Sequence, residues 1–127
     1  MKLGIVIALT TAVMLMGLNI YADACRWDVA VNYWADGCSG VSDLWFTNDC
    51  HKHDICYACG ARFGISRLEC DNRWNENMKR SCKRSGGLFC SLIRATYYRT
   101  VRNHMEGSYR YTPAVFCDQD WVWDCAY

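Results

Sequence analysis

Hydrophobic positions recur at helical spacing in three stretches of the chain, with polar or glycine-rich segments between them. The first predicted helix begins near Thr47 or Asn48, since either side chain could cap its free backbone donors, and it ends at about residue 60. Residues 25–44 before it are rich in turn-forming residues, including the pairs Asp36-Gly37 and Ser39-Gly40. We therefore expect a loop-rich opening followed by a helix.

The second predicted helix has a clear start and a clear end. Ser66 and Glu69 form the capping-box pattern, and the helical spacing continues until the two glycines at 86–87. A third helix fits residues 88–105, and we expect the last segment, which holds the only proline, Pro113, to be irregular. Short connections favour antiparallel neighbours, so the pattern predicts an all-α fold.

A positively charged start followed by an apolar run identifies residues 1–24 as a predicted secretory signal peptide. Lys2 precedes an apolar run over 3–18, and Ala22 and Ala24 supply the small residues of a cleavage site. The other interpretation, a membrane anchor, is disfavoured because the run is shorter than the ~20 residues that span a bilayer. We expect a secreted, extracellular protein.

All ten cysteines lie within residues 25–127, beyond the predicted signal peptide. An even number of cysteines in a short secreted chain is typical of a disulfide framework. A zinc site would favour paired C-x-x-C units, and Cys56 and Cys59 form the only such unit. The sequence thus predicts one small, disulfide-rich, all-α domain over residues 25–127.

Charge is nearly balanced over the chain, with a formal net charge of +1, so we expect no nucleic-acid partner. The middle of the chain is nevertheless basic, and its end is acidic. The basic residues are Lys79, Arg80, Lys83, Arg84, Arg94, Arg99 and Arg102. Such residues either dock on anionic lipid or form ordinary solvated helix faces, and the sequence leaves both interpretations open.

The residues that can carry chemistry cluster in the first predicted helix. Cys50, His53 and Cys56 are spaced by three residues and share one helix face. Disulfides along this face would hold the imidazole of His53 rigidly, as a general base requires. Asp54 lies about 100° around the helix, where its carboxylate could bind a cation together with backbone carbonyls of a nearby loop. The pattern indicates a calcium-assisted hydrolase.

The second helix supplies a carboxylate partner for His53 if Cys56 bridges Cys70. Such a bridge holds the two helix backbones within ~6 Å of each other. In an antiparallel pair, the turn that carries His53 then faces the residues just after Cys70, and Asp71 is the first of these. A buried carboxylate on one imidazole nitrogen makes the other nitrogen a base, so the spacing predicts a His53–Asp71 dyad.

These residues resemble the active-site helices of secreted phospholipases A2. The stretch C-x-x-H-D-x-C-Y at 50–57 is similar to the first catalytic helix of that family, and C-D-x-x-W-x-x-x-M-x-x-x-C at 70–82 is similar to the second. The likeness is greatest to the small helical type of cone-snail venom (conodipines) and of bacteria and fungi. It implies two antiparallel active-site helices and hydrolysis of the sn-2 ester of glycerophospholipids at a membrane or micelle surface, with Ca²⁺ as cofactor.

The resemblance also implies roles for single residues. His53 would be the base, Asp71 its partner, and Tyr57 a member of their hydrogen-bond network. Cys38 would pair with Cys50. The calcium ligands would be the carboxylate of Asp54 and three backbone carbonyls, those of Gly37, Ser39 and Val41.

Two alternatives concern the protein as a whole. The same scaffold could serve a non-catalytic toxin or a module that binds a receptor or channel, although every residue needed for turnover is present. We expect a monomer, but the pair Lys83-Arg84 is either a dibasic processing site, which would give two disulfide-linked chains, or the basic end of a helix.

A last alternative concerns the lipid surface. Tryptophan combined with arginine suits the head-group layer of a membrane. The candidates for this contact are Trp121 and Trp123 near the end of the chain, with Arg94, Arg99 and Arg102 of the third predicted helix. Both tryptophans could equally cap the core beside Cys117 and Cys125, because tryptophan is mostly buried in folded proteins.

Overall fold

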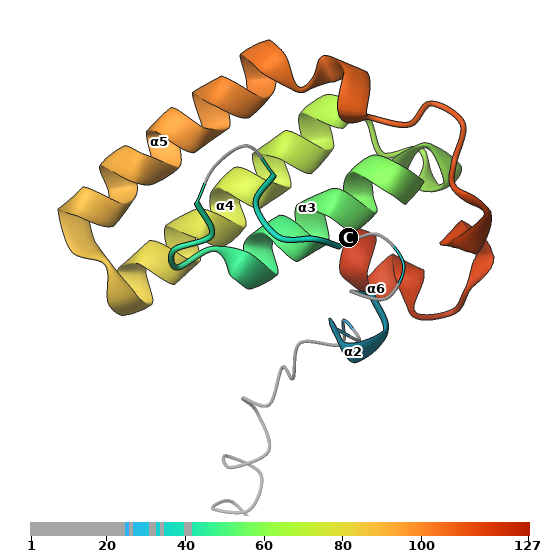
Figure 1. Cartoon of the computed structure of the whole chain (residues 1–127), viewed down its shortest axis with the longest axis horizontal. Coiled ribbons are helices and arrows are strands. Elements are labelled where there is room, and N and C mark those ends of the chain that lie inside the picture. The colour runs from blue at the N-terminus through green and yellow to red at the C-terminus, as the bar shows by residue number, and fades with distance from the viewer. Residues whose placement is uncertain (1–24, 26, 31–32, 34, 40–41) are drawn as a thin grey trace, which may run out of the picture.

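The computed structural model describes residues 25, 27–30, 33, 35–39 and 42–127, so the predicted signal peptide and Val41 lie outside the described residues. The helices are α2 (Trp27–Ala30), α3 (Thr47–Cys59), α4 (Arg67–Ser85), α5 (Gly87–His104) and α6 (Val122–Ala126), with 3₁₀ turns η1 (Gly60–Phe63), η2 (Glu106–Ser108) and η3 (Val115–Asp118). No strand occurs in this part of the chain, and the all-α prediction is confirmed (Figure 1). None of its helices is long and apolar enough to cross a membrane.

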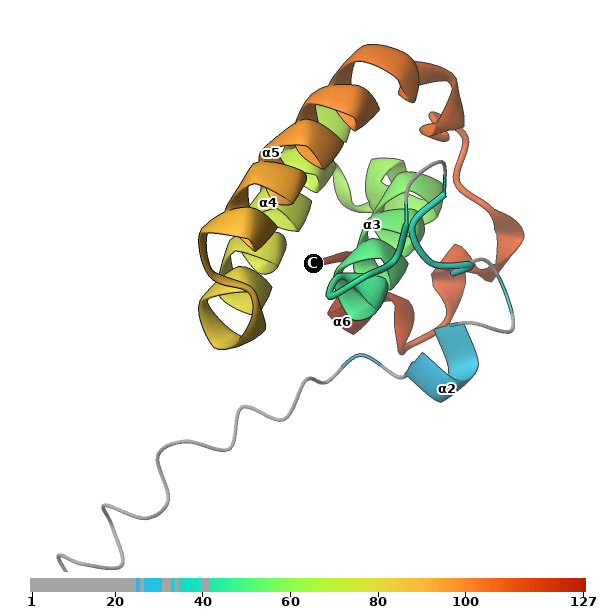
Figure 2. The ribbon, with the colours of Figure 1, turned by 60° about the vertical axis from the view of Figure 1, so that its left-hand side comes forward.

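Helices α3 and α4 pack against each other in opposite directions. Cys56 near the end of α3 is bonded to Cys70 near the start of α4, whereas Ser81 near the end of α4 donates a hydrogen bond to Asp49 at the start of α3. Helix α5 returns along α4, and Figures 1 and 2 show these two as neighbours from both directions. The expected antiparallel arrangement is therefore present.

The helix boundaries follow the predicted signals in one case and depart from them in another. Ser66 and Glu69 form a complete capping box at the start of α4, as the sequence predicts. At the start of α3, in contrast, neither Thr47 nor Asn48 caps the helix. The cap position is Phe46, which offers no side-chain hydrogen bond, and its burial in the core determines where the helix begins instead.

The segment after α5 is more regular than its sequence indicates. It forms η2, η3 and the short helix α6 where we expected irregular chain. Disulfides from Cys59 to Cys117 and from Cys25 to Cys125 tie this segment to the rest of the protein. Helices this short are set by such ties and by packing, because isolated short helices are unstable in water.

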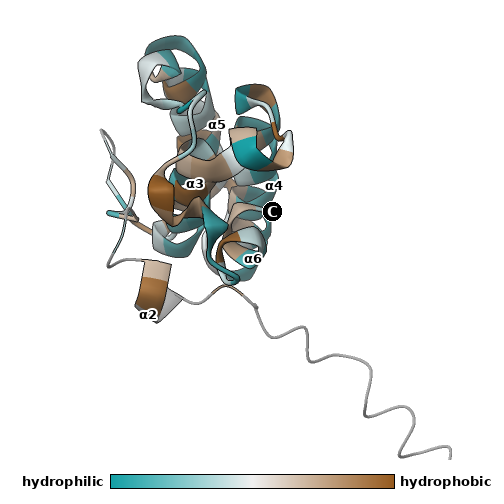
Figure 3. Ribbon diagram, turned by 90° about the vertical axis from the view of Figure 1, so that its right-hand side faces the viewer, coloured by the Kyte–Doolittle hydropathy of each residue, from teal (hydrophilic) through white to brown (hydrophobic). Residues whose placement is uncertain are grey.

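Two clusters of buried side chains lie on opposite sides of α3. The first includes Phe46, Trp74 and Met78 and fills the space among α3, α4 and α5. The second includes Ile55 and Val122 and joins α3 to α6 and η3. Figure 3 shows the hydrophobic last turns of α3 between α5, α4 and α6. This helix is consequently held from both sides.

All ten cysteines are paired, in five disulfides, so the predicted framework is confirmed. Both expected pairs, Cys38–Cys50 and Cys56–Cys70, are among them. Cys82–Cys90 joins the end of α4 to the start of α5, and the exposed pair Lys83-Arg84 lies between these cysteines in the last turn of α4. Cleavage at that pair would leave the two pieces joined by this bond, and the processing itself stays a prediction.

Candidate active site

The predicted partners His53 and Asp71 lie in direct contact between α3 and α4. His53 Nε2 is 2.7 Å from Asp71 Oδ1, and the Tyr57 hydroxyl donates to the same oxygen at 2.6 Å. Asp71 is fully buried and His53 is 9% exposed. The helix spacing and the Cys56–Cys70 bond thus bring the pair together as the sequence indicates.

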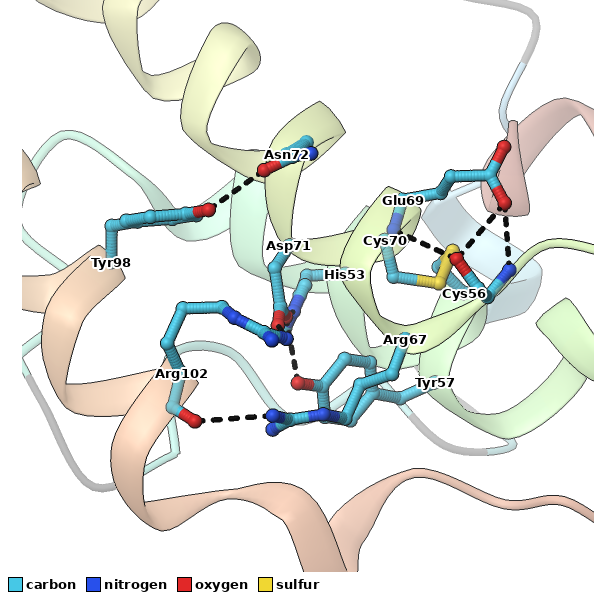
Figure 4. Close-up of polar contacts among 11 residues, drawn as sticks. His53, Cys56, Tyr57, Arg67, Glu69, Cys70, Asp71, Asn72, Tyr98 and Arg102 are labelled. Carbon is cyan, nitrogen blue, oxygen red and sulfur yellow. Dashed lines mark hydrogen bonds and ion pairs between the residues drawn. A yellow bond between two sulfur atoms is a disulfide. The ribbon is translucent and has the colours of Figure 1, made fainter.

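The second oxygen of Asp71 has a partner that the sequence analysis did not identify. Arg102 of α5 places its guanidinium 2.5 Å from Asp71 Oδ2, and Figure 4 shows the carboxylate enclosed by Arg102, His53 and Tyr57. Arg67 donates to the carbonyl of Arg102 at 3.1 Å, so the backbone of this part of α5 is held against α4 as well. Arg102 is therefore part of the site and is engaged with Asp71, although its position in the basic stretch made it a candidate for lipid contact.

These contacts keep Asp71 ionised. Burial alone would raise the pKa of this carboxyl, but hydrogen bonds from His53, Tyr57 and Arg102 outweigh burial and lower the pKa. The same surroundings raise the pKa of Tyr57, because burial and the neighbouring carboxylate both disfavour a phenolate. Tyr57 is accordingly a neutral donor that orients Asp71.

An ionised Asp71 determines which nitrogen of His53 carries the proton. A carboxylate accepts hydrogen bonds but cannot donate them, so Nε2 holds the hydrogen and Nδ1 keeps a free lone pair. Burial lowers the pKa of His53 and the hydrogen bond to Asp71 opposes that shift; the net effect favours the neutral ring. The ring stacks on Trp74, with centroids 4.7 Å apart, which limits its rotation. The imidazole of His53 is therefore neutral and held in one orientation, with Nδ1 able to accept a proton.

A cavity of about 620 Å³ opens beside this ring. It is lined on one side by His53, Asp54 and the loop at 36–39, and on the other by Val101 of α5 and by Met105, Ser108 and Arg110 after that helix. Polar and apolar side chains both line this cavity, and small-molecule sites combine the two. The base and the predicted cation ligand thus border one space.

Asp54 projects toward the loop that should complete the cation site. Its Oδ2 accepts a hydrogen bond from the backbone N–H of Asp36 at 3.1 Å. Burial raises the pKa of Asp54 to about 8, and the nearby carboxylates of Asp36 and Asp43 add to the shift. The protein alone therefore does little to stabilise the negative charge of an ionised Asp54, and a bound cation would favour the ionised form.

Gly37 and Asp43 shape this loop. Asp43 Oδ1 accepts the backbone N–H of Cys38 at 2.6 Å. Gly37 adopts a φ of 91°, in the region that favours glycine, and a Cβ at this position would lie 2.7 Å from the same Asp43 oxygen. The turn therefore needs glycine for two reasons, and both come from the way the loop folds back on Asp43.

The residues around Asp54 carry carboxylate, hydroxyl and backbone oxygens, which are the kinds of ligand that a hard cation such as calcium takes. No group of three or more His, Cys, Asp or Glu side chains in the described part of the chain could hold a metal by itself. A cation here would thus depend on backbone carbonyls. Gly37 and Ser39 line the cavity with Asp54, whereas Val41 lies outside the described residues.

Comparison with known proteins identifies relatives of part of the chain. Conodipine-P1, Conodipine-P2 and Conodipine-P3 of Conus purpurascens are each 43% identical to it over 56 residues, which is 41% of this chain and 32% of each relative. The predicted resemblance to conodipines is confirmed over that stretch. The chain spans about a third of the length of these relatives. No family model and no solved structure matches it.

Proposed function

We propose that the protein is a secreted, calcium-dependent phospholipase A2 that hydrolyses the sn-2 ester of glycerophospholipids. The observation that carries the proposal is the shared cavity, which is bordered both by His53, the partner of Asp71, and by Asp54. The similarity to conodipines supports the family. The five disulfides support secretion, because such bonds persist in oxidising compartments.

His53 would begin the reaction by accepting a proton from water on Nδ1. The water oxygen forms a bond to the sn-2 carbonyl carbon, and the resulting tetrahedral species expels the glycerol oxygen. The imidazolium returns its proton to that oxygen, which releases a fatty acid and a lysophospholipid. Asp71, held by Tyr57 and Arg102, stabilises the imidazolium between these two proton transfers.

Calcium bound by Asp54 and the carbonyls of Gly37, Ser39 and Val41 would polarise the ester carbonyl and stabilise the oxyanion. The chain's own contribution there is to hold the donor atoms beside His53. The raised pKa of Asp54 supports a cation at this carboxylate, because a positive charge would offset both burial and the repulsion from Asp36 and Asp43.

The proposal is tested with the purified protein on mixed phospholipid vesicles, with products identified by mass spectrometry. We expect lysophospholipid and free fatty acid in the presence of calcium, and reversible loss of both when a chelator is added. Calorimetric titration should show calcium binding that Asp54→Asn weakens sharply. Activity that is indifferent to chelation would overturn the mechanism. Folded protein with no hydrolysis at any calcium level would favour a non-catalytic toxin or binding module on the same scaffold.

A further inference from the structure

An apolar patch is exposed at the tip where α4 turns into α5. It consists of five side chains, Leu44, Trp45, Leu88, Phe89 and Leu92, which we call the tip patch. Leu88, Phe89 and Leu92 on the first turns of α5 are 88%, 67% and 68% exposed. Trp45 meets Phe89 edge-on, with ring centroids 6.4 Å apart, so the loop before α3 and the start of α5 form one surface.

Leu44 adds to the unusual character of this surface. It is 53% exposed, and its φ of 43° lies in the left-handed region that a leucine rarely adopts. The fold gains little from a large apolar side chain at that place. Clustered exposed apolar residues of this kind are typical of interaction sites.

Basic residues outnumber acidic ones around the tip patch, although Asp43 adjoins Leu44 and Asp49 lies near Arg84. Between Glu76 and Glu106 the chain has seven lysines and arginines and no acidic residue. Some of these cations are engaged inside the protein, as Arg102 is with Asp71. Lys83 and Arg84, in the last turn of α4, are exposed beside the tip patch. The edge of the patch is therefore cationic.

The side of α5 that begins in the tip patch ends at the cavity. Phe89, Ile93, Tyr97 and Val101 follow one another at intervals of four residues and so lie along one side of α5, and Met105 comes directly after the helix. Phe89 belongs to the tip patch, and Val101 and Met105 line the cavity beside His53. The Tyr97 hydroxyl donates to the carbonyl of Ser42 at 2.9 Å, which holds the loop along this side of α5. Ile93 and Tyr97 pack against the first buried cluster, so this side of α5 fixes the position of the tip patch relative to the cavity.

We propose that the tip patch docks the protein on the surface of an anionic phospholipid membrane. The apolar side chains would enter the layer between head groups and acyl chains, while Lys83 and Arg84 contact anionic head groups. A second copy of the chain is disfavoured as the occupant, because it would bring two cationic edges together. The inference rests on the proposed function for its purpose, but docking itself requires no catalysis.

The carboxyl-terminal tryptophans are less suited to this contact. Trp121 stacks on Phe116, with centroids 5.9 Å apart, and packs against the second buried cluster. Trp123 is 44% exposed but stacks on Tyr127. Asp118, Asp120 and Asp124 surround them in the sequence and would be repelled by anionic lipid. The charge beside the tip patch is positive and attracts anionic lipid, whereas the carboxyl-terminal end is negative and is repelled by it.

The main experiment measures binding of the full chain to sedimented vesicles, with His53→Gln as the background so that the lipid is not consumed. Vesicles of phosphatidylcholine alone are compared with vesicles that also contain phosphatidylglycerol. Replacing Leu88, Phe89 and Leu92 with serine should weaken binding to both by roughly tenfold or more, since three apolar side chains no longer enter the bilayer. Val115→Ser, at a residue that is 98% exposed in η3, is the matched control and should bind normally.

A second variant tests the charged edge without touching any apolar residue. Lys83→Gln with Arg84→Gln should weaken binding to the anionic vesicles by about tenfold or more and leave binding to phosphatidylcholine nearly unchanged. Added salt should reduce this difference. Because both side chains are exposed, a folding defect is not expected, and circular dichroism checks this for every variant.

The outcomes separate docking from catalysis. If vesicle binding depends on the tip patch but the wild-type protein hydrolyses no lipid, docking is supported and the proposed function is contradicted. Hydrolysis by the wild type with vesicle binding unaffected by either variant would overturn docking alone. Loss of binding when Trp121 and Trp123 are replaced, but not with the tip variants, would place the membrane contact at the other end. A wild-type dimer that the tip variants convert to monomers, without change in vesicle binding, would identify the patch as an interface between copies.

Discussion

The two sides of α3 face regions of different character. Among the described residues, the buried polar side chains are His53, Asp71 and Ser81, and all three lie between α3 and α4. The second cluster, between α3 and the carboxyl-terminal segment, contains only apolar residues and cysteines among its buried members. Buried polar groups destabilise a protein unless they are paired, and apolar contacts do not carry that cost. One region holds paired polar groups in its interior, and the other is a purely apolar support for the same helix.

Helix α3 belongs to both regions because its residues alternate between two faces. Cys50, His53 and Tyr57 lie toward α4 and the cavity, while Ile55 and Cys59 lie in the second cluster. A base that must keep its position within a fraction of an ångström needs a helix that cannot shift. The second cluster provides this support. It contributes to the position of His53 only indirectly, by holding α3 in place. Four changes test that division, from the largest expected effect to the smallest.

His53→Gln should have the largest effect, and only on catalysis. Glutamine keeps a hydrogen bond to Asp71 but removes the base, so we expect a loss of at least the ~10²-fold typical of general-base removal. The measurement is the rate of lipid hydrolysis, with the melting temperature as the check on folding. His104→Gln, at an exposed residue of α5, is the control. A folded His53→Gln protein with near-normal turnover would show that another group is the base.

Removing the Cys59–Cys117 bond should affect stability far more than the chemistry itself. This bond closes 58 residues, and the chain-entropy model gives about 4 kcal/mol for a loop of that length, against about 2.5 kcal/mol for the 8 residues closed by Cys82–Cys90. Paired alanine substitutions at each bond can be compared by denaturant unfolding. Equal losses of unfolding free energy for the two bonds would mean that the Cys59–Cys117 bond has no special role in holding the second cluster against α3.

Arg102→Met tests a residue that joins α5 to the polar region. Methionine keeps the apolar stem but leaves Asp71 Oδ2 without its guanidinium, so we expect about 1.5–3 kcal/mol less stability. We also expect roughly tenfold slower hydrolysis with little change in KM, because Asp71 then holds the imidazolium less firmly.

The control for Arg102 is Arg99→Met, at an exposed position one turn away. If Arg102 acts through the carboxylate, its substitution should slow an Asp71→Asn protein much less than it slows the wild type. Equal slowing in both backgrounds would mean that Arg102 affects the site by another route.

Gly37→Ala should have the smallest effect, confined to the loop beside Asp54. The added Cβ would meet Asp43 Oδ1 and require a φ of 91°, so we expect about 1–2 kcal/mol less stability and weaker calcium binding in calorimetry. Gly64→Ala separates the two causes, since its φ of 70° is also strained but its Cβ would meet nothing within 4 Å. Unchanged calcium binding in Gly37→Ala would show that this loop does not contribute to the cation site.

Much of the candidate site could be predicted because its residues are close in sequence or tied by a disulfide. His53 and Asp54 are neighbours, and Asp71 follows a cysteine bonded to Cys56, so helix geometry alone brings these groups together. Arg102 could not be predicted in the same way. Its separation of 31 residues from Asp71 depends on the register of α5 against α4, which no local pattern specifies.

The same distinction applies to the rest of the chain. The capping box of α4 is a local pattern, and the structure confirms it, whereas the start of α3 depends on the burial of Phe46 and departs from the local signal. The sequence by itself determined the helices with strong periodicity, that the cysteines would pair with one another and, given a bond from Cys56 to Cys70, the pairing of His53 with Asp71, since these follow from the spacing and number of residues along the chain. Only the tertiary structure decided the guanidinium on Asp71, the close approach of Gly37 to Asp43 and the exposure of the tip patch, because each requires segments distant in sequence to pack in one particular register.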